Sequence, residues 1–168
     1  MPSMMRLINI ISRCGAIWRA DKLRGTDLGD AHHSYILTLC KDPGISQDSL
    51  SRRLFINKSN VTRTLSYLEK QGYVTRKQSD EDRRIILVYP TEKAYAALPE
   101  VRDIVHGWNE YVTQDLTPEE SAQLAEILPK MAARAAEYAK LSEEALGDGG
   151  AEEKKPEKCV AEQENTEK

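Results

Sequence analysis

The sequence lacks the features that mark secreted and membrane-spanning proteins. Its three cysteines, Cys14, Cys40 and Cys159, show neither a CxxC pair nor the spacing of a disulfide framework, which indicates a reducing compartment. No apolar run approaches the length needed to span a bilayer, and polar residues interrupt the apolar N-terminus, so neither a membrane span nor a signal peptide is indicated. We therefore expect a cytoplasmic protein without a membrane partner.

Enzyme motifs are missing as well. The chain contains no nucleophile elbow, no phosphate-binding loop and no closed set of metal ligands. The densest acidic group is Asp80, Glu81 and Asp82, but three consecutive residues cannot converge on one atom without contorting their loop. We expect a protein that is not an enzyme and uses no cofactor.

Charge is distributed unevenly along the chain. The formal net charge is −3, yet residues 46–89 hold nine basic and five acidic residues, whereas residues 143–168 hold nine acidic residues and four lysines. Local charge decides what a surface can bind, so the basic segment matters more than the net value. The last segment is rich in Gly, Glu and Lys and nearly free of apolar residues, which predicts a disordered acidic tail over 147–168.

Helical periodicity begins at the N-terminus. Apolar residues recur at helical spacing over 4–22, and further apolar residues lie on the opposite side of the same helix, which indicates that a partner chain covers it. Asp30 is expected to cap a second helix that runs to about Cys40. The residues on the first apolar stripe are Met4, Leu7, Ile8, Ile11, Cys14 and Trp18, and those opposite are Met5, Ile10 and Ile17.

Two long helices are predicted near the C-terminus. Thr91 caps the first, which runs to about Gln114, and the capping box that starts at Thr117 opens the second, which runs to about Leu146. Pro99 and Pro129 lie inside these patterns, where each is expected to kink or interrupt its helix.

Two short helices in the middle of the chain form a helix-turn-helix pattern. Ser46 caps the first, and Asn57 caps the second, which is closed by Gly72. The second helix has one apolar stripe, and its other face is polar, which suits the DNA major groove. Arg63 can bond guanine and Asn60 adenine. Ser59 and Thr62 can bond either kind of base edge, whereas Lys58, Arg52 and Arg53 are better placed for phosphates. The stripe consists of Val61, Leu65 and Leu68.

Two strand-like runs follow, Tyr73–Lys77 and Ile85–Tyr89, joined by a polar turn and ended by Pro90. Two helices followed by a basic hairpin make a winged helix. At this point residues 44–94, and the LTPEE segment at 116–120, resemble the MarR-type transcriptional regulators. The resemblance rests on Leu-Glu-x-x-Gly at 68–72 and on the Asp-x-Arg wing at 82–84. The usual Leu-Thr after the wing is Pro90-Thr91 here, and the glycine that commonly follows is Ala94.

The resemblance implies a fold that is mainly α with a small β-wing. A winged helix-turn-helix domain over 28–90 would bind double-stranded DNA. A dimerisation domain would be built from the helix over 4–22 and the helices over 91–146. The protein would act as a homodimeric repressor on a pseudo-palindromic operator and respond to a small-molecule effector. Arg84 would enter the minor groove and Asp82 would orient it or tie the wing to the recognition helix, while Ser46 and Arg83 complete the DNA-contacting set.

Other interpretations remain open at this stage. His32, His33, and His106 with Glu110 four residues later suggest metal sensing, but helix-cap and surface histidines are commoner. Cys14 invites comparison with redox-sensing relatives, although a buried thiol on an apolar stripe is usually inert. Trp18, His33 and Tyr35 can line an effector cavity or simply belong to the core. A protein-binding module that has lost DNA binding is the remaining alternative.

Overall fold

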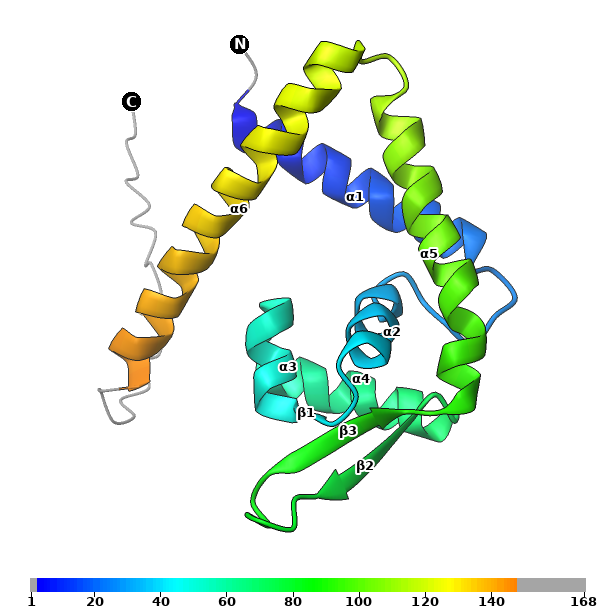
Figure 1. The fold of residues 1–168 in the computed structure, drawn as a ribbon, viewed down its shortest axis with the longest axis vertical. Helices are drawn as coiled ribbons and strands as arrows, with labels where there is room; N and C mark the ends of the chain where they lie inside the picture. The colour runs from blue at the N-terminus through cyan, green and yellow to red at the C-terminus, as the bar shows by residue number, and fades with distance from the viewer. Residues whose placement is uncertain (1–2, 148–168) are drawn as a thin grey trace, which may run out of the picture. The chain divides into compact units, whose positions relative to one another are not determined.

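The computed structural model describes residues 3–147, and the chain divides into two compact units at Ser121. The first unit holds five helices and a small sheet, and the second holds most of the last helix (Figure 1). The predicted tail beyond Gly147, with Cys159, lies outside the described residues. The elements in chain order are α1 (Met4–Lys22), α2 (His32–Lys41), β1 (Ile45–Ser46), α3 (Gln47–Leu54), α4 (Lys58–Lys70), β2 (Val74–Gln78), β3 (Ile86–Pro90), α5 (Glu92–Thr113) and α6 (Pro118–Gly147).

Side-chain caps begin four of these helices where the sequence predicts them. The hydroxyl of Ser46 accepts a hydrogen bond from the Ser49 N–H at 3.1 Å, and the Asn57 amide oxygen accepts one from the Asn60 N–H at 2.8 Å. Thr91 caps α5 in the same way. At the start of α6, the Thr117 hydroxyl and the Glu120 carboxylate each accept the backbone N–H of the other residue, at 3.2 and 2.8 Å. These caps confirm the predicted capping box.

The predicted cap of α2 is wrong. Ala31 stands at the N-cap position, and its side chain makes no capping bond. The two histidines supply local bonds instead, because the Gly29 N–H donates to Nδ1 of His32 at 2.9 Å and Nδ1 of His33 bonds the Asp30 carbonyl. Asp30 therefore contributes its backbone oxygen rather than its carboxylate.

Neither internal proline interrupts its helix, which corrects that part of the prediction. Pro99 lies inside α5 and Pro129 inside α6, and helical residues continue on both sides of each. A proline removes one backbone donor, and long helices can lose a single bond when the rest of the ladder remains.

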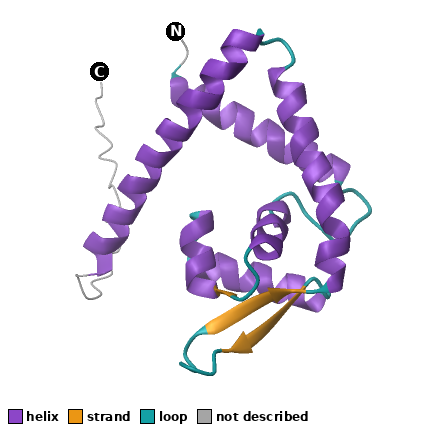
Figure 2. Cartoon of the chain, viewed as in Figure 1, coloured by secondary structure: helices purple, strands orange, loops and turns teal. Residues whose placement is uncertain are grey.

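The sheet has three antiparallel strands in the order β1-β3-β2, drawn in orange in Figure 2. Both predicted strands exist, shifted by one residue, so that Pro90 is the last residue of β3 rather than the residue after it. β1 was not predicted, because two residues show no alternation. Ile45 pairs with Val88 in this added strand, which joins the wing to the segment that enters α3.

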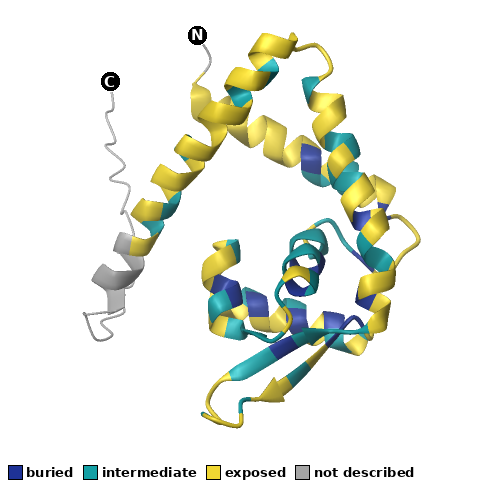
Figure 3. Cartoon of the chain, viewed as in Figure 1, coloured by how far each residue is buried: buried dark blue, intermediate teal, exposed yellow. Residues whose placement is uncertain are grey.

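The core lies in the first unit, around α2, as the dark residues of Figure 3 show. Ile36 and Leu39 of α2 have no exposed surface, and the predicted stripe of α4 is buried at 1% exposure or less. Burial of this stripe directs the opposite face of α4 to solvent. The other core side chains include Tyr35, Leu50, Val74, Val88, Ala94 and Val101.

The crossing of α1 and α5 depends on two glycines. Gly15 of α1 is buried beneath Trp108, and a Cβ at this position would lie 3.1 Å from the indole. The reciprocal site is Gly107 of α5, where a Cβ would lie 3.5 Å from Trp18. Each helix therefore places a tryptophan over a glycine of the other. The Trp18 indole N–H also donates to the Ile104 carbonyl at 3.1 Å.

This packing predicts opposite effects for two equivalent substitutions. Gly107→Ala should stabilise the protein by up to about 1 kcal/mol, because alanine is the better helix former and its methyl group fits. Gly15→Ala should lose that gain and be less stable than Gly107→Ala by about 1–3 kcal/mol, because the methyl group pushes Trp108. Urea denaturation of the two variants measures the difference, and equal stabilities would contradict the close approach at Gly15.

Candidate nucleic-acid interface

The turn between α3 and α4 is closed by a buried serine. The hydroxyl of Ser51 donates to the Ile56 carbonyl at 2.6 Å, and the Ile56 N–H donates to the Ser51 carbonyl at 3.2 Å. Phe55, between these residues, adopts a left-handed conformation with φ of 53° and caps the end of α3. These bonds and the buried residues Leu50 and Val61 hold the two helices as one unit.

The first turns of α4 present short polar side chains held by local bonds. Ser59 donates to the Asn57 amide oxygen at 2.9 Å, and Thr62 donates to the Lys58 carbonyl at 2.9 Å. Arg63 donates to the amide oxygen of Asn60. These three bonds lie within α4 and its cap, so they order the side chains locally. Ser59, Thr62 and Arg63 are exposed, which leaves them accessible to a ligand.

The sequence analysis missed Gln47, which connects the two helices of this motif. Its side-chain amide donates to the Thr62 hydroxyl at 3.0 Å, across the gap between α3 and α4. A glutamine in the first turn of a helix carries no signal of its own, so only the fold reveals this contact.

Two of the predicted phosphate-binding cations, Arg53 and Lys58, are paired with acids of the same chain. Lys58 lies 2.9 Å from Asp48, and Arg53 is paired with Asp42 at the end of α2. Arg52 makes only a 3.4 Å contact with the Ser49 hydroxyl. Exposed ion pairs of this kind contribute little stability, so a phosphate can displace the carboxylate at small cost.

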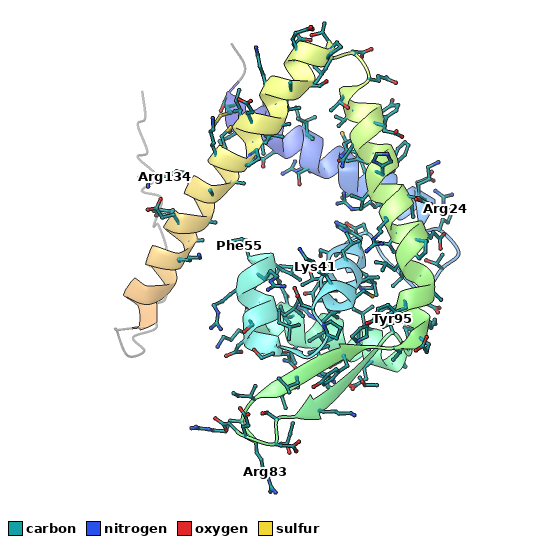
Figure 4. The ribbon with its side chains drawn as sticks, in the orientation of Figure 1. Arg24, Lys41, Phe55, Arg83, Tyr95 and Arg134 are labelled. Carbon is teal, nitrogen blue, oxygen red and sulfur yellow. The ribbon has the colours of Figure 1, made fainter. Side chains whose placement is uncertain are left out.

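The wing arginine is ordered by the acid two residues before it. Nε and Nη2 of Arg84 donate to the two carboxylate oxygens of Asp82, both at 3.1 Å, and the Arg84 N–H donates to Oδ1 at 2.9 Å. These hydrogen bonds from Arg84 lower the pKa of Asp82. The guanidinium nevertheless remains 92% exposed. Arg83 lies beside it at the tip of the hairpin and projects from the turn (Figure 4).

A cleft of about 460 Å³ lies between the start of α3 and the wing. It brings together three of the predicted DNA-contacting residues, Ser46, Arg52 and Arg84, whereas Arg53 does not line it. The wing arginine and the first helix of the motif thus border one concave surface. The remaining lining residues are Gln47, Asp48, Ser49, Ile85 and Ile86.

A carboxylate near the end of α4 ties this helix to the wing. Nε and Nη2 of Arg76, on β2, donate to Oε2 of Glu69 at 3.0 and 2.6 Å, and the Arg76 N–H donates to Oε1 at 3.1 Å. These bonds from Arg76 lower the pKa of Glu69. Glu69 is the glutamate of the Leu-Glu-x-x-Gly motif, so the structure gives a physical role to that part of the motif.

The three candidate effector-pocket residues have different surroundings in the structure. Tyr35 is 1% exposed and belongs to the core, and His33 is half-buried against the Asp30 carbonyl. Burial lowers the pKa of His33. Trp18 borders a pocket of about 580 Å³. The other lining residues of this pocket are Cys14, Ile17, Ala20, Asp21, Arg24, Trp108 and Tyr111.

The candidate metal- and redox-sensing residues lie on α1, α2 and α5. His106 lies 3.3 Å from Glu110 on α5, but residues 3–147 contain no group of three or more His, Cys, Asp or Glu side chains placed to hold a metal ion. Cys14 is exposed in the single chain, contrary to its expected burial on the apolar stripe. Within the same described range, no helix has both the length and the hydropathy required to cross a membrane.

Residues 26–85, which contain α2, α3, α4, β2 and most of the wing turn, match the model of the MarR family. The match covers 60 of the 168 residues and makes this segment similar to the MarR family. The chain shares the winged helix-turn-helix fold of solved MarR and SlyA regulators.

The relatives extend the likeness beyond the winged helix. The HTH-type transcriptional regulator YybA of Bacillus subtilis (strain 168), itself uncharacterised, is 24% identical over 131 residues, 78% of this chain and 87% of YybA. A MarR transcriptional regulator from Methanosarcina mazei Go1 has a TM-score of 0.77 at 26% identity, with 80% of this chain and 97% of the other covered. A MarR-family regulator from Listeria monocytogenes, solved with a 26mer DNA, has a TM-score of 0.78 at 24% identity, with coverage of 86% and 96%.

The Glu69–Arg76 tie predicts a loss of stability in acid. The pKa of Glu69 in the folded protein lies below its ordinary value of 4.5, so its contribution is complete above that pH and disappears as the pH falls through the folded value. Glu69→Gln should therefore be less stable than the wild type at pH 7, by about 1 kcal/mol or less for a partly exposed pair. The two proteins should converge once the pH has fallen below the lowered pKa of Glu69.

Denaturant titrations at pH 7, 5, 4 and 3 measure this difference. Glu81→Gln removes the same charge from an exposed residue of the wing turn and is the matched control. A difference between wild type and Glu69→Gln that persists unchanged at pH 3 would show that the carboxylate is not the source of the stabilisation.

Proposed function

We propose that this regulator acts as a homodimeric repressor that reads a pseudo-palindromic operator with α4 and the wing. The observation that carries the proposal is the joint placement of an exposed polar helix face and an oriented wing arginine in one rigid domain. Glu69 and Arg76 link these two surfaces. In such a domain the second helix of the motif enters the major groove.

Within the major groove, Arg63 and Asn60 are the candidates for direct readout. Their mutual hydrogen bond in the free protein occupies groups that would otherwise bond guanine and adenine edges. Ser59 and Thr62 complete the base-facing set. Ser46, Arg52, Arg53, Lys58 and Arg83 contact phosphates in this proposal, and their distribution around α3, the start of α4 and the wing would fix the register of the domain on the duplex.

In this proposal Arg84 enters the adjacent minor groove. Narrow A·T-rich segments of this groove concentrate negative potential and attract arginine. The bidentate bond from Arg84 to Asp82 restricts the guanidinium before DNA arrives, so less conformational entropy is lost on insertion. Asp82 thus acts as a positioning residue for Arg84.

Exposed apolar surface supports the homodimer. In the single chain, Met4, Leu7, Ile8 and Ile11 of α1 are 38–58% exposed, although one helix seldom displays so much apolar surface to water. Tyr111 and Leu116 at the end of α5, and Ile127, Leu128 and Tyr138 of α6, are exposed as well. A second copy that covers these helices would place two α4 helices on successive major grooves, about 34 Å apart.

Ligand response is proposed for the pocket beside Trp18. Its volume of about 580 Å³ lies within the range of small-molecule sites, and three aromatic rings border it. His33 and Tyr35 are not among the residues that line this pocket, so we propose that they support the helices around it. A bound molecule would release DNA only to the extent that it prefers a dimer with misplaced α4 helices.

The DNA-binding proposal predicts distinct effects for two arginines. Arg63→Ala should cost about 1–3 kcal/mol of binding free energy and relax sequence preference, because a base contact is lost. Arg84→Ala should weaken binding and reduce the salt dependence, because a cation near the phosphates is lost. Fluorescence anisotropy with fragments selected from the source genome, at several salt concentrations, measures both quantities.

Arg24→Ala is the charge-matched control, since Arg24 lies far from the wing tip (Figure 4). Equal binding by all three variants and the wild type would refute the assigned contacts. A wild-type protein that shifts no genomic fragment in a salt-dependent way would instead favour the protein-binding module.

The dimer proposal predicts that a charge on α1 separates the subunits. Ile11→Glu places an unpaired carboxylate in the proposed interface, where its desolvation is costly, and should shift the protein toward monomer. Tyr95→Glu alters an equally accessible side chain of α5 outside that surface and should not change the mass. Analytical ultracentrifugation distinguishes the outcomes, and an unchanged dimer in Ile11→Glu would exclude this face of α1.

A further inference from the structure

A second tie holds α4 on the flank that does not face the wing. The phenol of Tyr67 donates to the backbone carbonyl of Asp27, in the loop between α1 and α2, at 2.8 Å. The ring of Tyr67 also packs on the imidazole of His32, with 5.0 Å between ring centroids. These two contacts join α4 to the segment through which α1 leads into the winged helix.

Lys93 of α5 connects the same loop to the end of α4. Its Nζ donates to the carboxylate of Asp27 at 2.7 Å and to the Gln71 carbonyl at 2.9 Å, and it lies 4.3 Å from the centroid of the Tyr73 ring. The bond to Asp27 raises the pKa of Lys93. A cation on a carbonyl just past a helix C-terminus is favourably placed, because the helix dipole is negative there.

The loop that carries Asp27 is itself well fixed. Leu23 and Leu28 on either side of it are buried in the core, and Thr26 bonds the backbone of both. Arg19 of α1 donates to the Asp30 carbonyl at 3.3 Å. A displacement of the end of α1 would therefore be transmitted through the loop to the side of α4.

Tyr67 and Glu69 leave α4 on roughly opposite sides, because residues two apart on a helix diverge widely. Glu69 bonds the wing and Tyr67 bonds the loop, so α4 is held against rotation about its own axis from both sides. The apolar stripe of Val61, Leu65 and Leu68 resists separation from the core but resists rotation less, since apolar contacts are non-directional.

We propose that Asp27, Tyr67 and Lys93 form a positioning junction that sets the orientation of α4 for sequence readout. None of the three is among the residues assigned to DNA contact, so they act through α4. Base readout requires donors and acceptors in register with base edges, whereas attraction to phosphates tolerates small rotations. Loss of the junction should therefore reduce sequence selectivity more than affinity for DNA in general. This inference rests on the proposed function.

Tyr67→Phe is the sharpest test, because it removes one hydroxyl and keeps the ring on His32. We expect it to weaken binding to a fragment selected by the wild type about 3- to 10-fold, as the loss of one hydrogen bond implies. Binding to a shuffled duplex of the same length, and the salt dependence, should stay within error. Tyr95→Phe is the matched control. Lys93→Met should act in the same direction as Tyr67→Phe, and Lys93→Arg should restore most of the selectivity.

Amide hydrogen exchange on the DNA-free protein provides a readout that does not depend on the operator. Tyr67→Phe and Lys93→Met should exchange faster along α4 than the wild type, while the buried amides of α2 remain protected. Unchanged exchange in α4 together with an unchanged ratio of specific to non-specific affinity would overturn the junction. If the wild type selected no DNA, the proposed function would fail, and the exchange data would still decide whether the junction holds α4.

Discussion

The interface depends on the burial of a single stripe of α4. The stripe consists of Val61, Leu65 and Leu68, which are buried in the core. The remaining positions of α4 therefore lie on its flanks or face solvent. Because the stripe is narrow, contacts on the flanks of α4 must fix the rotation of this helix about its own axis. Glu69 makes such a contact with β2, and Tyr67 makes one with the loop after α1. The polar face of α4 is thus presented by a helix whose position is determined at three separate contacts.

Three of the six cations assigned to DNA contact are paired with carboxylates of the same chain. Lys58, Arg53 and Arg84 are paired with Asp48, Asp42 and Asp82 respectively. Such pairing orders long side chains and limits repulsion between neighbouring cations. In the proposed complex, DNA would compete with carboxylates already in place, so the affinity would reflect an exchange of partners rather than the attraction of free charges.

Local chemistry made much of this fold predictable. The caps at Ser46, Asn57 and Thr91, the stripe of α4 and the two strands of the hairpin follow from residue type and spacing. The family resemblance supplied the roles of Asp82 and Arg84. The errors have physical causes. Asp30 was assigned as a cap because its type favours that role, while the neighbouring histidines took the local bonds.

The tertiary contacts could not be predicted from patterns in the sequence. The two residues of β1 are too few to show a strand periodicity. The bond between Asp27 and Lys93 joins positions 66 residues apart, and Tyr67 meets Asp27 across 40. Neither pairing follows from spacing along the chain. The assignment of individual residues to bases or phosphates remains a prediction.

The short strand β1 has a consequence for the DNA rather than for the protein. Its pairing with β3 bonds the segment entering α3 directly to the returning strand of the wing, and Gly44 adds a bond to the Val88 carbonyl at 2.8 Å. The wing therefore cannot swing independently of the helix-turn-helix. If the distance between the wing and the helix-turn-helix is fixed, a bound DNA duplex must adapt to it. Groove width and ease of bending depend on the DNA sequence, so they would contribute to operator choice at base pairs that no side chain contacts.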